Sequence, residues 1–130
     1  MPRIEKGQNP ATGLGGLDSL KAAKLAEINA AFAVAEQTGH ELSSLGFEVD
    51  ANETANRNVE GLIKVLSATG ETETYFCDYN NQMQAVTLEQ LKTIQLEIIG
   101  YGQRLYQKKW LLREAVNAAA TAEEVEAVQW

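Results

Sequence analysis

The chain is poor in the residues that build metal centres and covalent cross-links. Its 130 residues include one cysteine, Cys77, and one histidine, His40. One cysteine cannot form an internal disulfide, and one cysteine with one histidine cannot supply the four ligands of a structural zinc site. We therefore expect no metal and no cofactor. We interpret Cys77 as a small hydrophobic residue of a strand and His40 as a solvated or helix-capping residue.

Long apolar runs and an excess of basic residues are also missing. No stretch approaches the roughly 20 apolar residues that span a bilayer, and the first ten residues contain no signal-like apolar segment. The formal net charge is −7 and the pI is near 4.7. Bulk attraction to DNA or to an anionic membrane needs a basic surface. We expect a soluble protein, made in the cytoplasm, with no nucleic-acid and no membrane partner.

Both prolines and four of the ten glycines fall within residues 1–16. That composition predicts an extended arm rather than a folded element. The larger aliphatic residues of the arm are Ile4 and Leu14, and we predict that they anchor it to a neighbouring chain. Residues 17–130 are long enough for a single domain with one modest hydrophobic core.

Helical periodicity dominates the first half of that domain. We predict a helix at about 19–38, with Asp18 as its N-cap and Gly39 as a left-handed terminator, and a second at about 53–68 that ends before Gly70. Between them, residues 47–50 alternate in polarity, which indicates a brief strand or an extended lead-in. The apolar faces are Leu25, Ile28, Phe32 and Ala35 in the first helix, and Ala55, Val59, Leu62, Ile63 and Leu66 in the second.

A β-hairpin is predicted next, from residues 72–79 and 82–86. Asn80 and Asn81 would form its two-residue turn, because asparagine tolerates the left-handed conformation that such a turn demands. The register that follows places two sets of side chains on opposite faces, and we expect the first set to face the core. The first set is Phe76, Met83 and Ala85, and the second is Tyr75, Cys77 and Val86.

One long helix, at about 87–119, organises the rest of the chain. Thr87 and Gln90 form a capping box at its start. Gly100 and Gly102 predict a bend or a close backbone contact near its middle. A heptad seam starts at Leu91 and predicts one buried face. The seam consists of Leu91, Ile94, Ile98, Tyr101, Leu105, Lys108, Leu112, Ala115 and Ala119.

A second, largely apolar stripe lies on roughly the opposite side of this helix. The polar face of an ordinary surface helix is therefore missing, and we expect part of this stripe to meet another protein. A second capping box at residues 121–124 predicts a short terminal helix that ends at Trp130, which would anchor on the body or on a partner. The stripe consists of Leu96, Ile99, Gln103, Tyr106 and Trp110.

Together these elements predict an α+β fold that is predominantly helical. It would contain two N-terminal helices, one β-hairpin, one long two-faced helix and a short C-terminal helix. We expect its partner-binding residues to be those of the arm, the second stripe and the C-terminus. They are Ile4, Leu14, Leu96, Ile99, Tyr106, Trp110 and Trp130.

The second half of the chain resembles a known family. The succession YFCDYNNQMQAVT, LEQLKTIQLEIIGYGQRLYQKKWLLREAV and NAAATAEEVEAV is similar to a domain of unknown function that is common in phage and prophage proteins of the tail-fibre region. The segment LKAAKLAEINAA resembles the start of the same domain, so the similarity covers about residues 18–128. The matched positions are Asp78, Asn80, Asn81, Thr87, Tyr106, Trp110, Leu112 and residues 121–124.

The resemblance implies a role in tail or tail-fibre structure, attachment or assembly, and it implies no catalytic residues. We expect a non-enzymatic component of the phage tail, tail fibre or baseplate that is made in the host cytoplasm, resides in the virion and binds other tail or fibre proteins in a homo-oligomer or hetero-complex. An assembly chaperone that leaves before the particle is complete is the alternative.

Two further readings are less favoured. An enzyme would have to use lone acids near turns, Asp50 with Glu53 or Asp78 with Glu73, and such residues usually serve only as solvated charges. A nucleic-acid site would have to use the one basic cluster. Solvated charges around Trp110 explain that cluster better, given the acidic composition. The cluster is Arg104, Lys108, Lys109 and Arg113.

Overall fold

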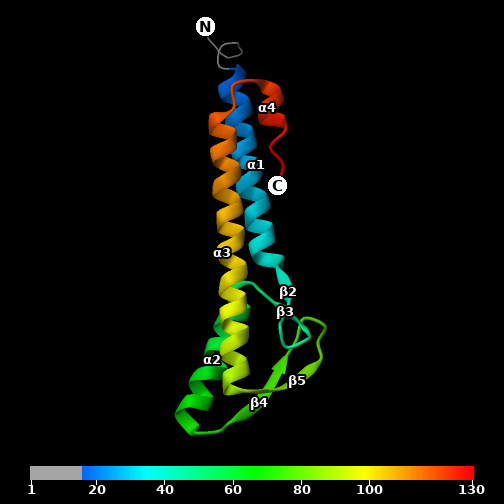
Figure 1. Ribbon diagram of the computed structural model, residues 1–130, viewed down its shortest axis with the longest axis vertical. Helices are drawn as coiled ribbons and strands as arrows, with labels where there is room; N and C mark the ends of the chain where they lie inside the picture. Colours follow the sequence, from blue (N-terminus) through cyan, green and yellow to red (C-terminus); the bar gives the residue numbers. More distant parts are fainter. Residues whose placement is uncertain (1–15) are drawn as a thin grey trace. The chain divides into compact units, whose positions relative to one another are not determined.

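The computed structural model describes residues 16–130, and Figure 1 shows their helices and strands. Helices make up 66% of these residues, and the strands form two antiparallel pairs, β2 with β3 and β4 with β5. The predicted helical α+β fold is therefore confirmed, with one strand pair more than we expected. In chain order the elements are α1 (Gly16–Thr38), β2 (His40–Leu42), β3 (Glu48–Asp50), α2 (Glu53–Thr69), β4 (Glu73–Cys77), β5 (Met83–Thr87), α3 (Leu88–Ala118) and α4 (Ala122–Glu126).

The described residues group into two compact units. Residues 16–33 and 106–130 form the first, which we call the terminal unit, and residues 34–105 form the second, which we call the central unit. Helices α1 and α3 each contribute residues to both units. The expectation that residues 17–130 form one domain stays a prediction.

The central unit holds the main hydrophobic core. Three residues of the predicted seam on α3, Leu91, Ile94 and Ile98, are almost fully buried there. They pack in one cluster with side chains from α2 and from both strand pairs, so the seam is confirmed in this unit. The other buried members of the cluster are Val49, Ala51, Val59, Leu66, Phe76 and Val86.

Local signals explain where α2 begins and ends and where α3 begins. The Asn52 side chain accepts a hydrogen bond from the Ala55 N–H at 2.8 Å, and Gly70 ends α2 in the left-handed conformation at φ 78°. At α3 the Thr87 hydroxyl accepts from the Gln90 N–H at 3.1 Å, while the Gln90 side chain accepts from the Thr87 N–H at 2.9 Å. The predicted capping box is thus confirmed.

Two charged side chains of α3 attach the β2–β3 pair to the central unit. Glu97 accepts hydrogen bonds from the Ser43 hydroxyl at 2.7 Å and the Ser44 N–H at 3.0 Å. Burial would raise the pKa of Glu97, but the hydrogen bonds from Ser44 and Ser43 outweigh it and hold the pKa below its ordinary value. Arg104 pairs with Glu41 of β2 at 2.6 Å.

The His40 side chain is partly exposed, as expected for a solvated residue, but it also makes two contacts that the sequence did not indicate. It begins β2, and its ring stacks on Tyr79 with centroids 4.0 Å apart. Its Nδ1 lies 2.9 Å from a carboxylate oxygen of Glu48. The Tyr79 N–H also donates to the Glu48 carbonyl at 2.8 Å, so these contacts join β3 to the turn of the second strand pair.

Gly39 was predicted to end α1 in the left-handed conformation, and this prediction is wrong. The described glycines with positive φ are Gly46 and Gly70. A Cβ at Gly39 would collide with the Tyr101 ring and lie 2.8 Å from the Ala35 carbonyl oxygen. Gly39 is required by the close approach of Tyr101 rather than by a left-handed turn.

The register predicted for the β4–β5 hairpin is also wrong. Cys77 pairs with Met83 and Phe76 with Gln84. The Asp78 N–H donates to the Gln82 carbonyl at 2.9 Å, so the turn it closes contains three residues, 79–81, with Asn81 in the left-handed conformation at φ 62°. A shift of one residue moves every side chain of one strand to the other face. Phe76 faces the core as expected, but its apolar companion there is Val86, while Met83 and Ala85 are exposed.

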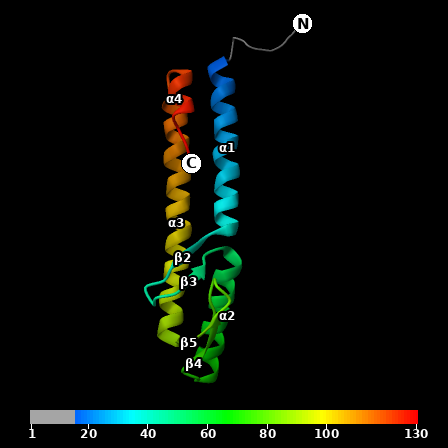
Figure 2. The same ribbon diagram turned by 90° about the vertical axis from the view of Figure 1, so that its right-hand side faces the viewer.

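In the terminal unit α1 and α3 run side by side, as Figure 2 shows. The Lys21 ammonium donates to the Asn117 carbonyl at 3.0 Å, and the Arg113 guanidinium donates to the Asn29 side chain at 2.9 Å. Helix α1 begins at Gly16, which we had placed in the arm, so Asp18 lies in the first helical turn instead of capping it.

The predicted seam drifts on α3 within the terminal unit. Val116 is fully buried where the heptad pattern predicted Ala115, whereas Ala119 is buried as expected. A strict seven-residue repeat drifts by about 20° per heptad relative to a straight helix, which accounts for the shift. The predicted capping box of α4 is confirmed, since the Thr121 hydroxyl accepts from the Glu124 N–H at 3.2 Å, but the helix ends at Glu126 instead of at Trp130.

The glycines inside α2 and α3 do not mark close packing within the described residues. A Cβ at Gly61 or Gly102 would have no neighbour within 4 Å outside its own helical turn, and at Gly100 it would meet only the flexible end of Arg104, at 3.5 Å. The close backbone contact that we predicted as one alternative at Gly100 and Gly102 is therefore not found among these residues.

Ile98 and Leu96 provide a matched test of the two sides of α3. Ile98 is 3% exposed and Leu96 is 71% exposed. Ile98→Ala should lower the unfolding free energy by about 2–5 kcal/mol, because it leaves a cavity in the core. Leu96→Ala should change it by less than about 0.5 kcal/mol. Denaturant melts of the isolated variants measure both, and equal losses would show that the two sides are equally buried.

Two glycine substitutions should have opposite effects on stability. Gly39→Ala should lower the unfolding free energy by about 1–3 kcal/mol, because the added methyl group overlaps Tyr101. Gly102→Ala should raise it by about 0.5–1 kcal/mol, because alanine favours the helix and the added methyl group has free space. Thermal melts measure the signs. A destabilising Gly102→Ala would show that the space beside Gly102 is occupied.

Asp78 should make the stability of the hairpin depend on pH. Hydrogen bonds from Gln82 and Gln84, and more weakly from Asn80, lower the pKa of Asp78 below 3.8 although burial opposes them. Because the pKa is lower in the folded state, the stabilisation is complete above pH 3.8 and is lost as the pH falls through the folded value.

Asp78→Asn should therefore be less stable than the wild type at neutral pH, and the difference should shrink in the acid range. Glu60→Gln on the exposed side of α2 controls for the loss of one charge. Denaturant melts across the pH range measure the difference, and a gap that stays constant down to the acid limit would contradict this role of Asp78.

Candidate interaction surfaces

The residues that we predicted on the second stripe of α3 are exposed in both units. In the central unit Leu96 is 71% exposed and Ile99 is 41% exposed. In the terminal unit Tyr106 is 53% exposed and Trp110 is 44% exposed. Side chains of this size are common in the centres of protein interfaces, so each unit presents candidate contact residues on α3. Ile4 and Leu14, which we also predicted to bind a partner, lie outside the described residues.

Four aromatic side chains of the terminal unit contact one another in a row. The Phe32 ring of α1 meets the rings of Tyr106 and Trp130 edge to face, with centroids 6.3 Å apart in both pairs. The rings of Tyr106 and Trp110 are 6.0 Å apart in the same kind of arrangement. Edge-to-face pairs at these distances are favourable. We call these four residues, with the cations beside them, the aromatic face.

Three cations lie over these rings. The Lys108 ammonium is 4.4 Å from the centre of the Trp130 ring, the Lys109 ammonium is 4.6 Å from that of Phe32, and the Arg113 guanidinium is 5.2 Å from that of Trp110. We interpreted these charges as solvated, and the structure adds contacts with aromatic rings. Arg104, the fourth member of the basic cluster, instead pairs with Glu41 in the central unit.

The cations of the aromatic face lack carboxylate partners in the part of the chain that the structure describes. None of the ion pairs among residues 16–130 includes Lys108, Lys109 or Arg113. The Arg113 Nε is buried and makes no hydrogen bond with these residues. The face therefore combines exposed aromatic surface with positive charge that is not neutralised by a nearby carboxylate.

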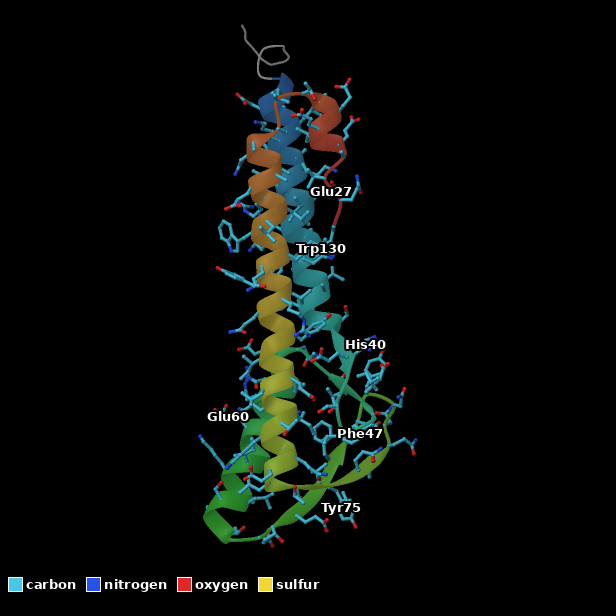
Figure 3. The ribbon with its side chains drawn as sticks, viewed as in Figure 1. Glu27, His40, Phe47, Glu60, Tyr75 and Trp130 are labelled. Atoms are coloured by element: carbon cyan, nitrogen blue, oxygen red, sulfur yellow. The ribbon has the colours of Figure 1, made fainter. Side chains whose placement is uncertain are left out.

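Trp130 contacts its own chain. Its ring packs on Phe32 and under the Lys108 ammonium, and Figure 3 shows the side chain beside the helices of the terminal unit. Of the two roles that we left open for this residue, an anchor on the body or on a partner, the structure shows the first. The remaining exposed part of the ring extends the aromatic face.

A second apolar surface lies on the outer side of the β4–β5 hairpin. Tyr75 and Met83 are largely exposed, and they belong to the neighbouring cross-strand pairs Tyr75–Ala85 and Cys77–Met83. Figure 3 shows Tyr75 pointing away from the ribbon. Sequence reasoning missed this surface because it assumed a two-residue loop. A three-residue loop that ends in a left-handed asparagine would have predicted it.

A groove in the central unit is the other surface that sequence reasoning missed. It encloses about 410 Å³ where the end of α2, the segment before β4 and the start of α3 meet. Leu66 and Leu88 supply apolar wall, and Glu71 and Glu89 supply carboxylates. The remaining lining residues are Ser67, Gly70, Thr72 and Thr87, so no basic residue lines the groove.

Candidate sites for chemistry are sparse in residues 16–130. They contain no group of three histidine, cysteine or acidic side chains placed to hold a metal ion. None of their helices combines the length and the apolar character that a membrane crossing requires. Asp78, which we weighed as a catalytic acid, instead accepts three hydrogen bonds within its own hairpin turn.

Comparison with known proteins identifies a domain of unknown function in this chain. No curated protein and no solved structure matches the chain significantly. A family model described as "Domain of unknown function (DUF4376)" matches residues 19–129, which include every described helix and strand except the first three residues of α1. The chain therefore belongs to the family defined by this domain of unknown function.

Proposed function

We propose that this protein is a non-enzymatic structural component of a phage tail, a small adaptor in the tail, tail fibre or baseplate that works by binding other tail proteins. The observation that carries the proposal is the exposure of Leu96, Tyr106 and Trp110 on a helix whose opposite side supplies the core. The resemblance of the sequence to domains of the tail-fibre region supports the phage setting.

The exposed side chains favour protein binding on physical grounds. Burial of apolar surface contributes about 25 cal/mol per Å², and aromatic residues such as Tyr106 and Trp110 are frequent energetic centres of interfaces. Their rings are already held by neighbouring rings at 6.0–6.3 Å, so binding would cost little side-chain entropy. This arrangement suits a surface prepared for contact.

A transient assembly chaperone would use the same surface. Such a protein would bind fibre chains in the host cytoplasm and be absent from the finished particle, whereas an adaptor would stay in the tail. An adaptor is present in the finished particle and a chaperone is absent from it, so the protein composition of purified particles distinguishes the two roles.

Mass spectrometry of purified particles tests the proposal. We expect peptides of this protein in particles from cells that express it, because an adaptor stays bound to its partners. Tyr106→Ala should reduce its incorporation at least about tenfold, because it removes an energetic centre of the interface. The equilibrium constant for folding should fall by a smaller factor. Gln107→Ala, an adjacent exposed position, is the matched control.

Absence of the protein from particles, together with capture of fibre chains from infected cells, would support the chaperone instead. If Tyr106→Ala lowers stability and incorporation to the same extent, Tyr106 belongs to the interior of the protein and the proposed contact surface is wrong.

A further inference from the structure

We propose that the protein binds a second copy of itself head to tail, with the aromatic face of one terminal unit seated in the groove of the central unit of the next copy. The inference goes beyond the proposed function and does not rest on it, because both surfaces belong to this chain and neither requires a phage partner.

The groove fits an aromatic side chain that carries positive charge beside it. Its volume of about 410 Å³ is within the usual range for pockets that hold small organic groups. Leu66 and Leu88 provide apolar contact, while Glu71 and Glu89 supply negative charge at the same place. Lys92 lies 3.4 Å from Glu89, so Glu71 is the carboxylate with no cation within ion-pair distance among the described residues.

The aromatic face carries the complementary groups. Trp110 is 44% exposed, and Lys109 and Arg113 lie within 6 Å of its ring. Those two cations make no ion pair within residues 16–130. Insertion of Trp110 into this apolar groove would bury the ring and bring the two cations close to the unpaired Glu71 carboxylate.

The charge of the two units also favours contact between unlike units of two copies. Residues 34–105 contain eleven acidic and four basic residues, whereas residues 16–33 and 106–130 together contain six acidic and five basic residues. Two central units repel each other, but a central unit and the cations of the aromatic face attract. This attraction weakens with salt because the groups are exposed.

The occupant that best satisfies these features is therefore another copy of the chain. A nucleic acid would offer phosphates to the cations, but the net charge of −7 opposes its approach and the acidic groove would stay unused. When two copies bind in this way, one aromatic face and one groove of the dimer remain free. Further copies can therefore add until a ring closes or a filament forms.

Sedimentation velocity of the full chain tests the proposal. The average mass should rise with protein concentration at low salt and fall when salt is added. Trp110→Ala removes the ring from the face and Glu71→Lys reverses the charge of the groove, and each should weaken self-association at least about tenfold. Leu111→Ala, at a neighbouring side chain that is 66% exposed, and Glu60→Lys, on the exposed side of α2, are the matched controls and should leave self-association unchanged.

A mixture of the two variants gives the sharpest result. Trp110→Ala keeps its groove and Glu71→Lys keeps its aromatic face, so together they should form a complex of one copy each that cannot grow further. Circular dichroism confirms that both variants fold. A wild type that stays monomeric at high concentration and low salt would overturn the proposal. Self-association that survives both substitutions, or a variant mixture that forms no complex, would also overturn it.

Discussion

The structure depends on the removal of one face of α3 from water. Leu91, Ile94 and Ile98 are at most 3% exposed, and they pack against α2 and against both strand pairs of the central unit. Because these residues are spaced three and four apart, they lie on one side of the helix. Helix α2 and the strands β3, β4 and β5 pack on this side through apolar contacts. Glu97 and Arg104 add polar contacts to the first strand pair. Without this burial the short strands would have no support, since an isolated hairpin is marginal in water.

Helix α3 also contributes exposed apolar residues to the surface of both units. Its other side exposes large apolar residues in each unit, and in the terminal unit cations cover the aromatic rings while acidic residues predominate in the central unit. Exposed aromatic side chains and unpaired charges do not stabilise the isolated chain. They do favour association with a surface of complementary shape and charge. The contact surfaces that we propose are built from these exposed residues.

The sequence predicted the helices well because their signals are local. Thr87 and Gln90 form their capping box as expected, and the spacing of the seam located the core. The orientation of the hairpin depended on one residue of loop length, which the Asn80-Asn81 pair did not reveal, so Met83 was assigned to the wrong face. Surfaces that combine distant segments could not be predicted: the aromatic face needs Phe32 of α1 beside α3, and the groove joins three separate segments.

The central claim is that α3 has a core side and a binding side. Hydroxyl-radical footprinting of aromatic side chains, read by mass spectrometry on the dilute protein and on the protein within its assembly, tests it most directly. Tyr106 and Trp110 should be reactive in the dilute protein and protected in the assembly, while Phe76 of the core should be protected in both. Equal protection of Tyr106 and Trp110 in the dilute protein, or equal reactivity in the two states, would contradict the claim.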